Sequence, residues 1–167
     1  MAKTFTSASA NKYLRTLDEE KEHLLYQERE LCTYTRAAGE TEEPPAYSYE
    51  DTRARVAAID AECRVIRHAL HLFNATCVLP SGITIDEALI KLAQLSYLKG
   101  TLSELRDKQE KERVTSTFTR SEMIEYRYAN FDVAKAAADY AETVRQIADL
   151  QLEIDLANQT QTFEVEL

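Results

Sequence analysis

The amino-acid sequence predicts a mainly α-helical protein with four long amphipathic helices, arranged as an antiparallel bundle or coiled coil, and two short β-strands flanking the last helix. Only three Gly and three Pro occur among 167 residues, and such sparse breaks indicate few, long elements. Apolar residues also recur at spacings of three and four along most of the chain, which is the period of an amphipathic helix. We therefore expect a single helical domain over residues 1–167.

The first helix is predicted from about Ser9 to Ala38, followed by Gly39 where a C-cap glycine would lie. Lys21 and Glu28 interrupt its apolar stripe, so we expect a narrower and more polar core face than in the later helices. The stripe consists of residues at helical spacing: Ala10, Leu14, Leu17, Leu24 and Leu31.

A loop is predicted over residues 39–47, because Pro44 and Pro45 cannot continue a helix. The second helix is predicted to begin with Ser48 as N-cap, with Asp51 three residues later as a weak form of the capping box. Its apolar residues repeat at spacings of 3, 4, 3, 4 and 3: Val56, Ile59, Cys63, Ile66, Leu70 and Phe73. This heptad seam predicts coiled-coil-like packing against a partner helix.

The third helix follows breaks at Pro80 and Gly82 and opens with a full capping box, Thr84 and Glu87. Its stripe is formed by leucines: Leu89, Leu92, Leu95, Leu98, Leu102 and Leu105. We expect Leu92 to share one core with residues of the second helix, namely Ile59, Ile66 and Leu70.

The fourth helix is predicted to start near Asp132 as N-cap and to end by Asn158. Its apolar residues are Val133, Ala137, Tyr140, Val144, Ile147 and Ile154. Four helices of roughly 26 to 30 residues would be rods about 40 to 45 Å long at 1.5 Å per residue, and similar lengths suit a bundle.

Two strand-like segments, residues 122–129 and 160–167, flank the fourth helix. Each alternates apolar and polar residues with the period of a strand. The apolar faces are Ile124, Tyr126 and Tyr128 in the first segment, and Phe163, Val165 and Leu167 in the second. We expect the segments to pair with each other or with their copies in a second chain, with Arg127 opposite Glu164 or Glu166.

Charge and composition weigh against several classes of protein. The net charge is -9 and no Lys/Arg cluster is free of acidic residues, which disfavours nucleic acids and anionic membranes as partners. No apolar run approaches the roughly 20 residues of a membrane span, and the N-terminus lacks the apolar core of a signal peptide. The three cysteines are an odd number without CxxC spacing, so we expect a reducing cytoplasm.

Few residue patterns could carry chemistry. Glu20 and His23 have the i, i+3 spacing of a metal-binding bundle, but the motif occurs once, and a dinuclear site needs it twice. The other candidates are read as surface, core or interface residues: His68, His71, Cys63, Tyr126, Tyr128 and Tyr140. Cys77 lies too far along the chain from the seam of the second helix to be assigned a place. No Gly-rich phosphate loop, nucleophile elbow or HExxH occurs. We therefore predict no catalytic, cofactor or metal site, and no enzyme.

Four segments resemble small bacterial helical proteins of unknown function, some of them labelled septicolysin: LHLFNAT (Leu70–Thr76), GITIDEAL (Gly82–Leu89), EYRYANFD (Glu125–Asp132) and NQTQTFEVEL (Asn158–Leu167). The resemblance covers roughly Tyr49 to the C-terminus and implies a helical, oligomeric bacterial protein. The leading hypothesis is a structural or protein-interaction protein that self-associates through its helical seams and tail strands. The alternative is a metal-binding or catalytic helical bundle.

Overall fold

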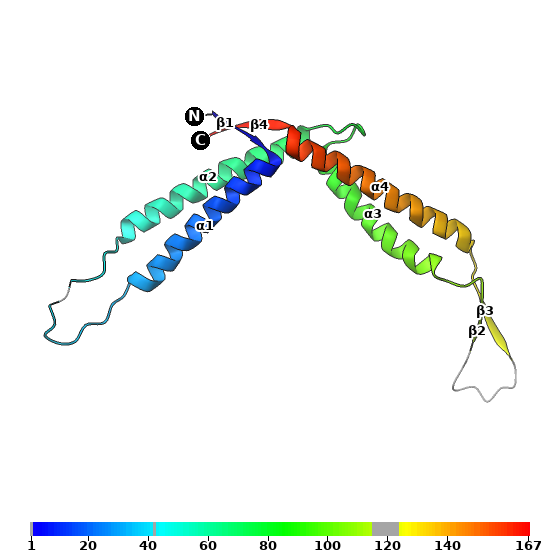
Figure 1. Cartoon of the computed structure of the whole chain (residues 1–167), viewed down its shortest axis with the longest axis horizontal. Helices are drawn as coiled ribbons and strands as arrows, with labels where there is room; N and C mark the ends of the chain where they lie inside the picture. Colours follow the sequence, from blue (N-terminus) through cyan, green and yellow to red (C-terminus); the bar gives the residue numbers. More distant parts are fainter. Residues whose placement is uncertain (1, 42, 115–123) are drawn as a thin grey trace. The chain divides into compact units, whose positions relative to one another are not determined.

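A computed structural model describes residues 2–41, 43–114 and 124–167 of the chain, which is mainly helical with short antiparallel strands (Figure 1). The helices are α1 (Ser7–Leu31), α2 (Tyr49–Thr76), α3 (Ile85–Arg106) and α4 (Val133–Thr160). The strands are β1 (Ala2–Thr6), β2 (Lys111–Val114), β3 (Glu125–Tyr128) and β4 (Thr162–Glu166). Where the sequence predicts one domain, the contacts divide the chain into two compact units: unit 1 is Met1–Cys77 with Leu156–Leu167, and unit 2 is Val78–Asp155.

The predicted starts of α2, α3 and α4 are confirmed by their capping interactions, whereas α1 begins at Ser7 with Thr6 as N-cap, two residues before the predicted start. The Ser48 hydroxyl accepts a hydrogen bond from the Asp51 N–H at 3.3 Å, and Thr84 forms a reciprocal capping box with Glu87. At the start of α4, Asp132 Oδ1 accepts a hydrogen bond from the backbone N–H of the third helical residue at 2.9 Å. Side chains that accept from the first free N–H groups explain why these helices begin where they do.

The end of α1 differs from the prediction. The helix ends at Leu31 with Cys32 as C-cap, so the following loop begins well before residue 39. Residues 33–35, Thr-Tyr-Thr, have poor helix propensity because branched and aromatic side chains lose rotamer freedom in a helix. Gly39 has φ +97° and lies within the loop, in a conformation that favours glycine.

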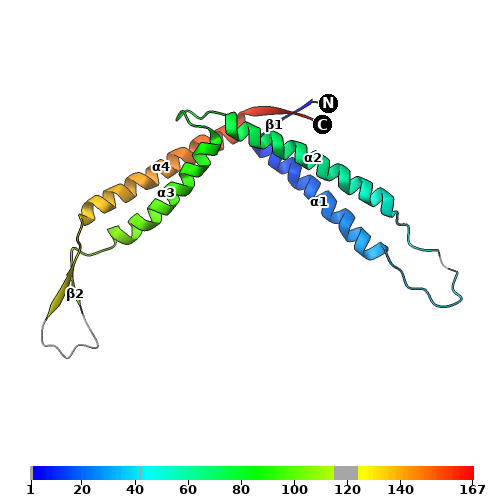
Figure 2. The same ribbon diagram turned by 180° about the vertical axis from the view of Figure 1, so that it is seen from behind.

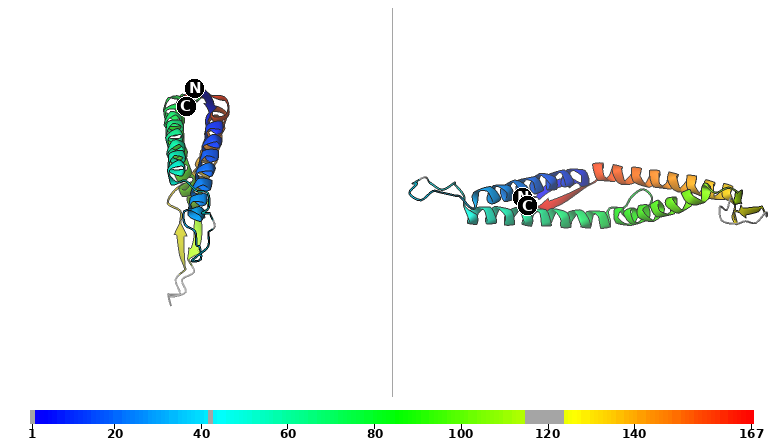
Figure 3. Two further views of the ribbon diagram at one scale, coloured as in Figure 1. Left: turned by 90° about the vertical axis from the view of Figure 1, so that its left-hand side faces the viewer. Right: turned by 90° about the horizontal axis from the view of Figure 1, so that it is seen from below.

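In unit 1, α1 and α2 lie side by side and run antiparallel, with β1 paired to β4 at one end of the helix pair (Figures 1, 2 and 3). The antiparallel β1–β4 register places Phe5 opposite Phe163. Ile59 and Ile66 are buried as predicted, whereas Leu70 is half-buried. The core draws on both helices and both strands: Phe5, Ala10, Leu14, Leu17, Ile59, Cys63, Ile66 and Val165.

In unit 2, α3 and α4 lie side by side (Figures 1 and 2), and the Arg106 guanidinium stacks 3.8 Å from the ring centre of Tyr140. Leu92 is half-buried and belongs to this unit, so the expectation of one core shared with Ile59 and Ile66 is wrong. The buried residues of unit 2 are Leu79, Ile85, Ala88, Leu95, Ala136, Thr143, Leu150 and Ile154. Among the described residues, no helix combines the length and apolar character that crossing a membrane requires.

The predicted pairing of the two strand-like segments is corrected. β3 pairs with β2 and β4 pairs with β1, two partners that the sequence analysis did not assign as strands. Arg127 therefore lies opposite Glu112, with Nη1 and Oε2 3.7 Å apart, instead of opposite Glu164 or Glu166. Residues 122 and 123 of the first predicted segment lie outside the described residues. The alternation in the second segment is confirmed, since Val165 is buried and Glu164 is exposed.

Candidate functional site

The polar residues that interrupt the stripe of α1 have partners on α2. The Lys21 ammonium donates to Asp60 Oδ1 at 2.6 Å. Glu28 accepts a hydrogen bond from the Tyr47 hydroxyl at 2.9 Å and another from the Arg53 guanidinium. Polar groups within a helical seam favour the one register that satisfies them. These contacts therefore help to fix α1 against α2.

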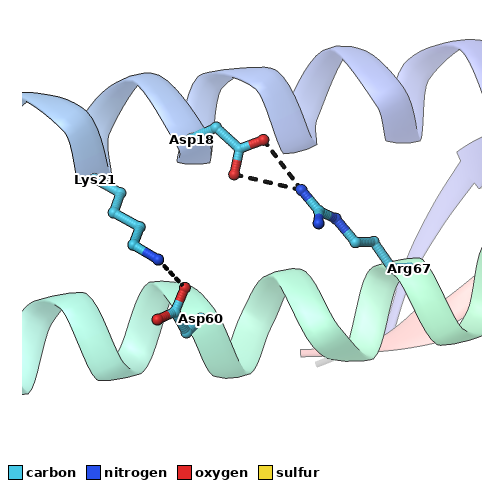
Figure 4. A network of polar contacts seen from close by, with 4 residues as sticks. All are labelled: Asp18, Lys21, Asp60 and Arg67. Atoms are coloured by element: carbon cyan, nitrogen blue, oxygen red, sulfur yellow. Dashed lines mark hydrogen bonds and ion pairs between the residues drawn. The ribbon is translucent and has the colours of Figure 1, made fainter.

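A second ion pair lies next to the first on the same side of the helix pair. Arg67 Nη2 donates to both carboxylate oxygens of Asp18, at 3.1 and 3.5 Å. Figure 4 shows the two pairs bridging α1 and α2, with Asp18 and Lys21 on one helix and Asp60 and Arg67 on the other. Both partners of the Asp18–Arg67 pair are more than half exposed, so this pair stabilises the fold by at most about 1 kcal/mol.

These ion pairs line a shallow groove between α1 and α2, which we call the polar groove. Its first part, about 330 Å³, is lined by Asp18, Lys21, Asp60, Cys63, Arg64 and Arg67. Its second part, about 540 Å³, shares Asp18 and Arg67 with the first and adds Asn11, Leu14, Arg15, Leu70 and His71. The groove thus extends to both sides of the Asp18–Arg67 pair.

Cys63 is a core residue that reaches the wall of the polar groove. It is buried, as the heptad seam of α2 predicts. Burial raises the pKa of its thiol, and the negative charge of Asp18 adds to this effect. Since the thiolate is the nucleophile and the metal ligand, Cys63 is held in its unreactive form.

The other histidine and cysteine candidates are not brought together. The Glu20 carboxylate accepts two hydrogen bonds from Arg55, at 2.5 and 2.8 Å, and His23 is exposed beside it. His68 and His71 are exposed on α2, and all three cysteines are free. Within residues 2–41, 43–114 and 124–167, no three metal-ligating side chains of the His, Cys, Asp or Glu type gather in one place.

The tyrosine candidates fall into two separate contacts. Tyr126 and Tyr128 lie on one face of β3, with ring centres 6.5 Å apart. The Lys111 ammonium lies 4.1 Å from the first ring and 5.5 Å from the second. Tyr140 instead contacts Arg106 of α3. These cation–π contacts connect neighbouring elements and form no single aromatic cage.

Large apolar side chains are exposed on the helices of unit 2. Tyr97 is 82% exposed and Leu152 is 70% exposed. Three of these side chains are exposed although the sequence predicts them in buried stripes, so that prediction is wrong for Leu89, Leu98 and Val144. We call the exposed set the outer apolar residues of unit 2: Leu89, Ile90, Tyr97, Leu98, Val144 and Leu152.

A different spacing could have identified the outer apolar residues. Ile85, Ala88, Leu92 and Leu95 follow one another at spacings of 3, 4 and 3 and already complete an inner heptad stripe. Ile85 and Ala88 lie at the start of α3 and are buried. The predicted stripe contained leucines alone and therefore left these two residues out. Apolar residues that do not belong to this stripe, such as Ile90 and Tyr97, must then lie on another side of the helix.

Comparison with known proteins supports the fold alone. No family model matches the sequence, and no curated protein matches it. The structure is similar to the crystal structure of a functionally unknown conserved protein from Corynebacterium diphtheriae, with a TM-score of 0.57 and 16% sequence identity. The match covers 98% of this chain and 100% of that one.

Proposed function

We propose that this chain is a structural or protein-interaction protein that self-associates through the outer apolar residues of unit 2. The observation that carries the proposal is that α3 is apolar on more than one side. Ile85 and Leu95 are buried in unit 2, while Ile90 and Tyr97 point elsewhere and are exposed. A helix with apolar residues around most of its surface is typically covered on several sides. Unit 2 covers α3 incompletely, so a further contact is expected.

The surfaces that the sequence suggests for self-association already have partners within the chain. Ile59 and Ile66 of the α2 seam pack in a core to which α1 contributes Leu14 and Leu17. The C-terminal strand β4 is paired with β1. These intrachain contacts leave the helices of unit 2 as the better contact between copies.

The outer apolar residues of unit 2 also indicate how two copies of the chain would pack together. Two α3–α4 pairs that pack along their outer apolar residues would form a four-helix bundle with coiled-coil-like contacts. This arrangement would bury Tyr97 and Ile90, whose exposure in a single copy is otherwise unfavourable. The free state of Cys32, Cys63 and Cys77 fits a reducing, cytoplasmic location.

Light scattering over a concentration series tests the proposal. The wild-type protein is expected to have a mass of at least twice that of one chain, which is 19.1 kDa. The double variant Ile90→Gln with Tyr97→Gln should shift to smaller species, with helical content by circular dichroism unchanged. Leu72→Gln is the matched control, because Leu72 is also an exposed helical residue but lies in unit 1. A monomeric wild type, or a double variant with the wild-type mass, would refute the proposal.

A further inference from the structure

We propose that the polar groove of unit 1 binds a small, elongated anion that carries phosphate or carboxylate groups. This inference is independent of self-association, because it rests on side chains of α1 and α2 and not on the outer apolar residues of unit 2. Three features of the groove support such a ligand: its positive local charge, two arginines that have no partner in the described part of the chain, and cationic groups spaced along its length.

The groove is positively charged, although the chain as a whole is negatively charged. Arg15, Lys21, Arg64 and Arg67 line it, against the carboxylates of Asp18 and Asp60. Four cations and two anions leave a local charge of +2, whereas the chain as a whole carries -9. Such a local excess of positive charge attracts small anions to the groove despite the negative charge of the whole chain.

The two carboxylates in the groove are already neutralised. Asp18 is paired with Arg67, and Asp60 is paired with Lys21. Arg15 lines one part of the groove and Arg64 the other. Within the described residues, neither of these two guanidinium groups has a hydrogen-bond or ion-pair partner. Each offers five N–H donors in a planar fork that matches a carboxylate or a phosphate.

The spacing of the cationic groups indicates an elongated ligand. Arg15 and Lys21 are six residues apart on α1, which corresponds to about 9 Å along the helix axis. Arg67 lies between the two parts of the groove and uses only Nη2 for Asp18, so its other N–H groups can donate to the middle of a ligand. Arg15 lines one part of the groove and Arg64 the other, so a ligand that meets both arginines must span both parts and carry an anionic group at each end.

The surrounding charge limits the size of the ligand. Because the groove is positive, the rest of the chain is even more acidic than the net charge of -9 implies. A nucleic acid would extend onto this acidic surface and be repelled, and its binding depends on many phosphate contacts. A short anion that ends within the groove avoids this repulsion.

Isothermal titration calorimetry of the full chain with tripolyphosphate tests the site, with citrate as a carboxylate probe and inorganic phosphate as a single-group probe. We expect saturable one-to-one binding of tripolyphosphate, of citrate or of both, and weaker binding of inorganic phosphate. Arg15→Gln and Arg64→Gln should each weaken binding by about tenfold, because each removes a charge-assisted contact.

Two further variants separate a built site from general attraction. Asp18→Asn should strengthen binding, since it removes a repelling carboxylate and releases Arg67. Arg113→Gln removes the same charge from exposed strand β2 of unit 2 and should change affinity by less than about twofold. Failure of all three probes to bind, an equal loss in Arg113→Gln, or weaker binding by Asp18→Asn would each overturn the proposal.

Discussion

Lys21 of α1 and Asp60 of α2 form an ion pair, with Nζ and Oδ1 2.6 Å apart, where the apolar stripe of α1 is interrupted. The hydrogen bond to Asp60 is the main cause of the raised pKa of Lys21. The two side chains remain 30% and 48% exposed, so water screens the attraction between them. The pair therefore contributes more to the register of the helices than to the stability of unit 1.

A double-mutant cycle with Lys21→Met and Asp60→Asn measures this pair. We expect a coupling free energy of about 0.2 to 1 kcal/mol from urea unfolding, the range of exposed ion pairs. Lys21→Met alone should change stability little, because methionine is a good helix former and supplies apolar surface at a seam position. A coupling of zero would contradict this prediction and show that the pair adds nothing to the stability of unit 1.

The core of unit 1 is tested at Ile66, whose side chain has no exposed surface. Ile66→Ala should lower the free energy of unfolding by about 2 to 4 kcal/mol, because it removes buried methyl groups and leaves a cavity. Val65→Ala is the control at the neighbouring position, which is 43% exposed, and should cost less than about 0.5 kcal/mol. Equal losses in the two variants would mean that the face of α2 is assigned wrongly.

The seam of α2 could be predicted from the sequence because its buried positions are occupied by large apolar residues. Ile59, Cys63, Ile66 and Phe73 are all buried. The predicted seam of α4 was displaced by one residue at Val144 for the opposite reason. Thr143 is buried where Val144 was expected, and its hydroxyl is satisfied by donating to the Asp139 carbonyl at 2.8 Å. A prediction from hydropathy alone places the valine in the core and the threonine outside it.

The strand partners could not be predicted because their pairing depends on the folded chain. β1 is short, and its partner β4 is about the whole length of the chain away. β2 carries Lys111, Glu112 and Arg113, which read as the solvated end of a helix. The polar groove was missed for a similar reason. Arg15 and Arg64 lie in separate charged stretches, and only the antiparallel packing of α1 against α2 brings those stretches to one side.

The capping box of α3 predicts a pH dependence of stability. Glu87 accepts hydrogen bonds from the Thr84 N–H at 2.8 Å and from the Thr84 hydroxyl at 3.1 Å. These bonds lower the pKa of the Glu87 carboxyl below its ordinary value of 4.5, with the backbone N–H as the largest cause. Folding therefore favours the ionised form. The resulting stabilisation is fully present above pH 4.5, the ordinary pKa of this carboxyl, and is lost as the pH falls through the lowered pKa of the folded state.

The variant Glu87→Gln keeps a hydrogen-bond acceptor and removes the charge. It should be less stable than the wild type at neutral pH, and the difference should disappear well below pH 4.5, the ordinary value for this carboxyl. Urea unfolding at both pH values gives the difference, and an NMR titration of Glu87 gives its pKa directly. A pKa at or above the ordinary value would contradict the capping contact.

The C-terminal strand β4 packs on the core of unit 1. In β4, Val165 is only 3% exposed and belongs to the core of unit 1. Phe163 stacks on Phe73 of α2, with ring centres 5.0 Å apart, and lies opposite Phe5 of β1. The strand therefore covers the end of the α1–α2 core. We expect deletion of residues 162–167 to lower the melting temperature of unit 1 and to reduce the near-UV aromatic signal, while most helical content is kept.

Point variants identify which face of β4 is responsible. Val165→Ala should cost about 1 to 3 kcal/mol, because it removes buried methyl groups from the core. Glu164→Ala changes the exposed face of the same strand, and it should alter stability by less than about 0.5 kcal/mol. Because β4 pairs with β1 within the chain, neither variant should change the mass measured by light scattering. Equal effects of the two variants on stability would mean that Val165 does not pack in solution. A fall in mass would show that the strand also joins separate copies.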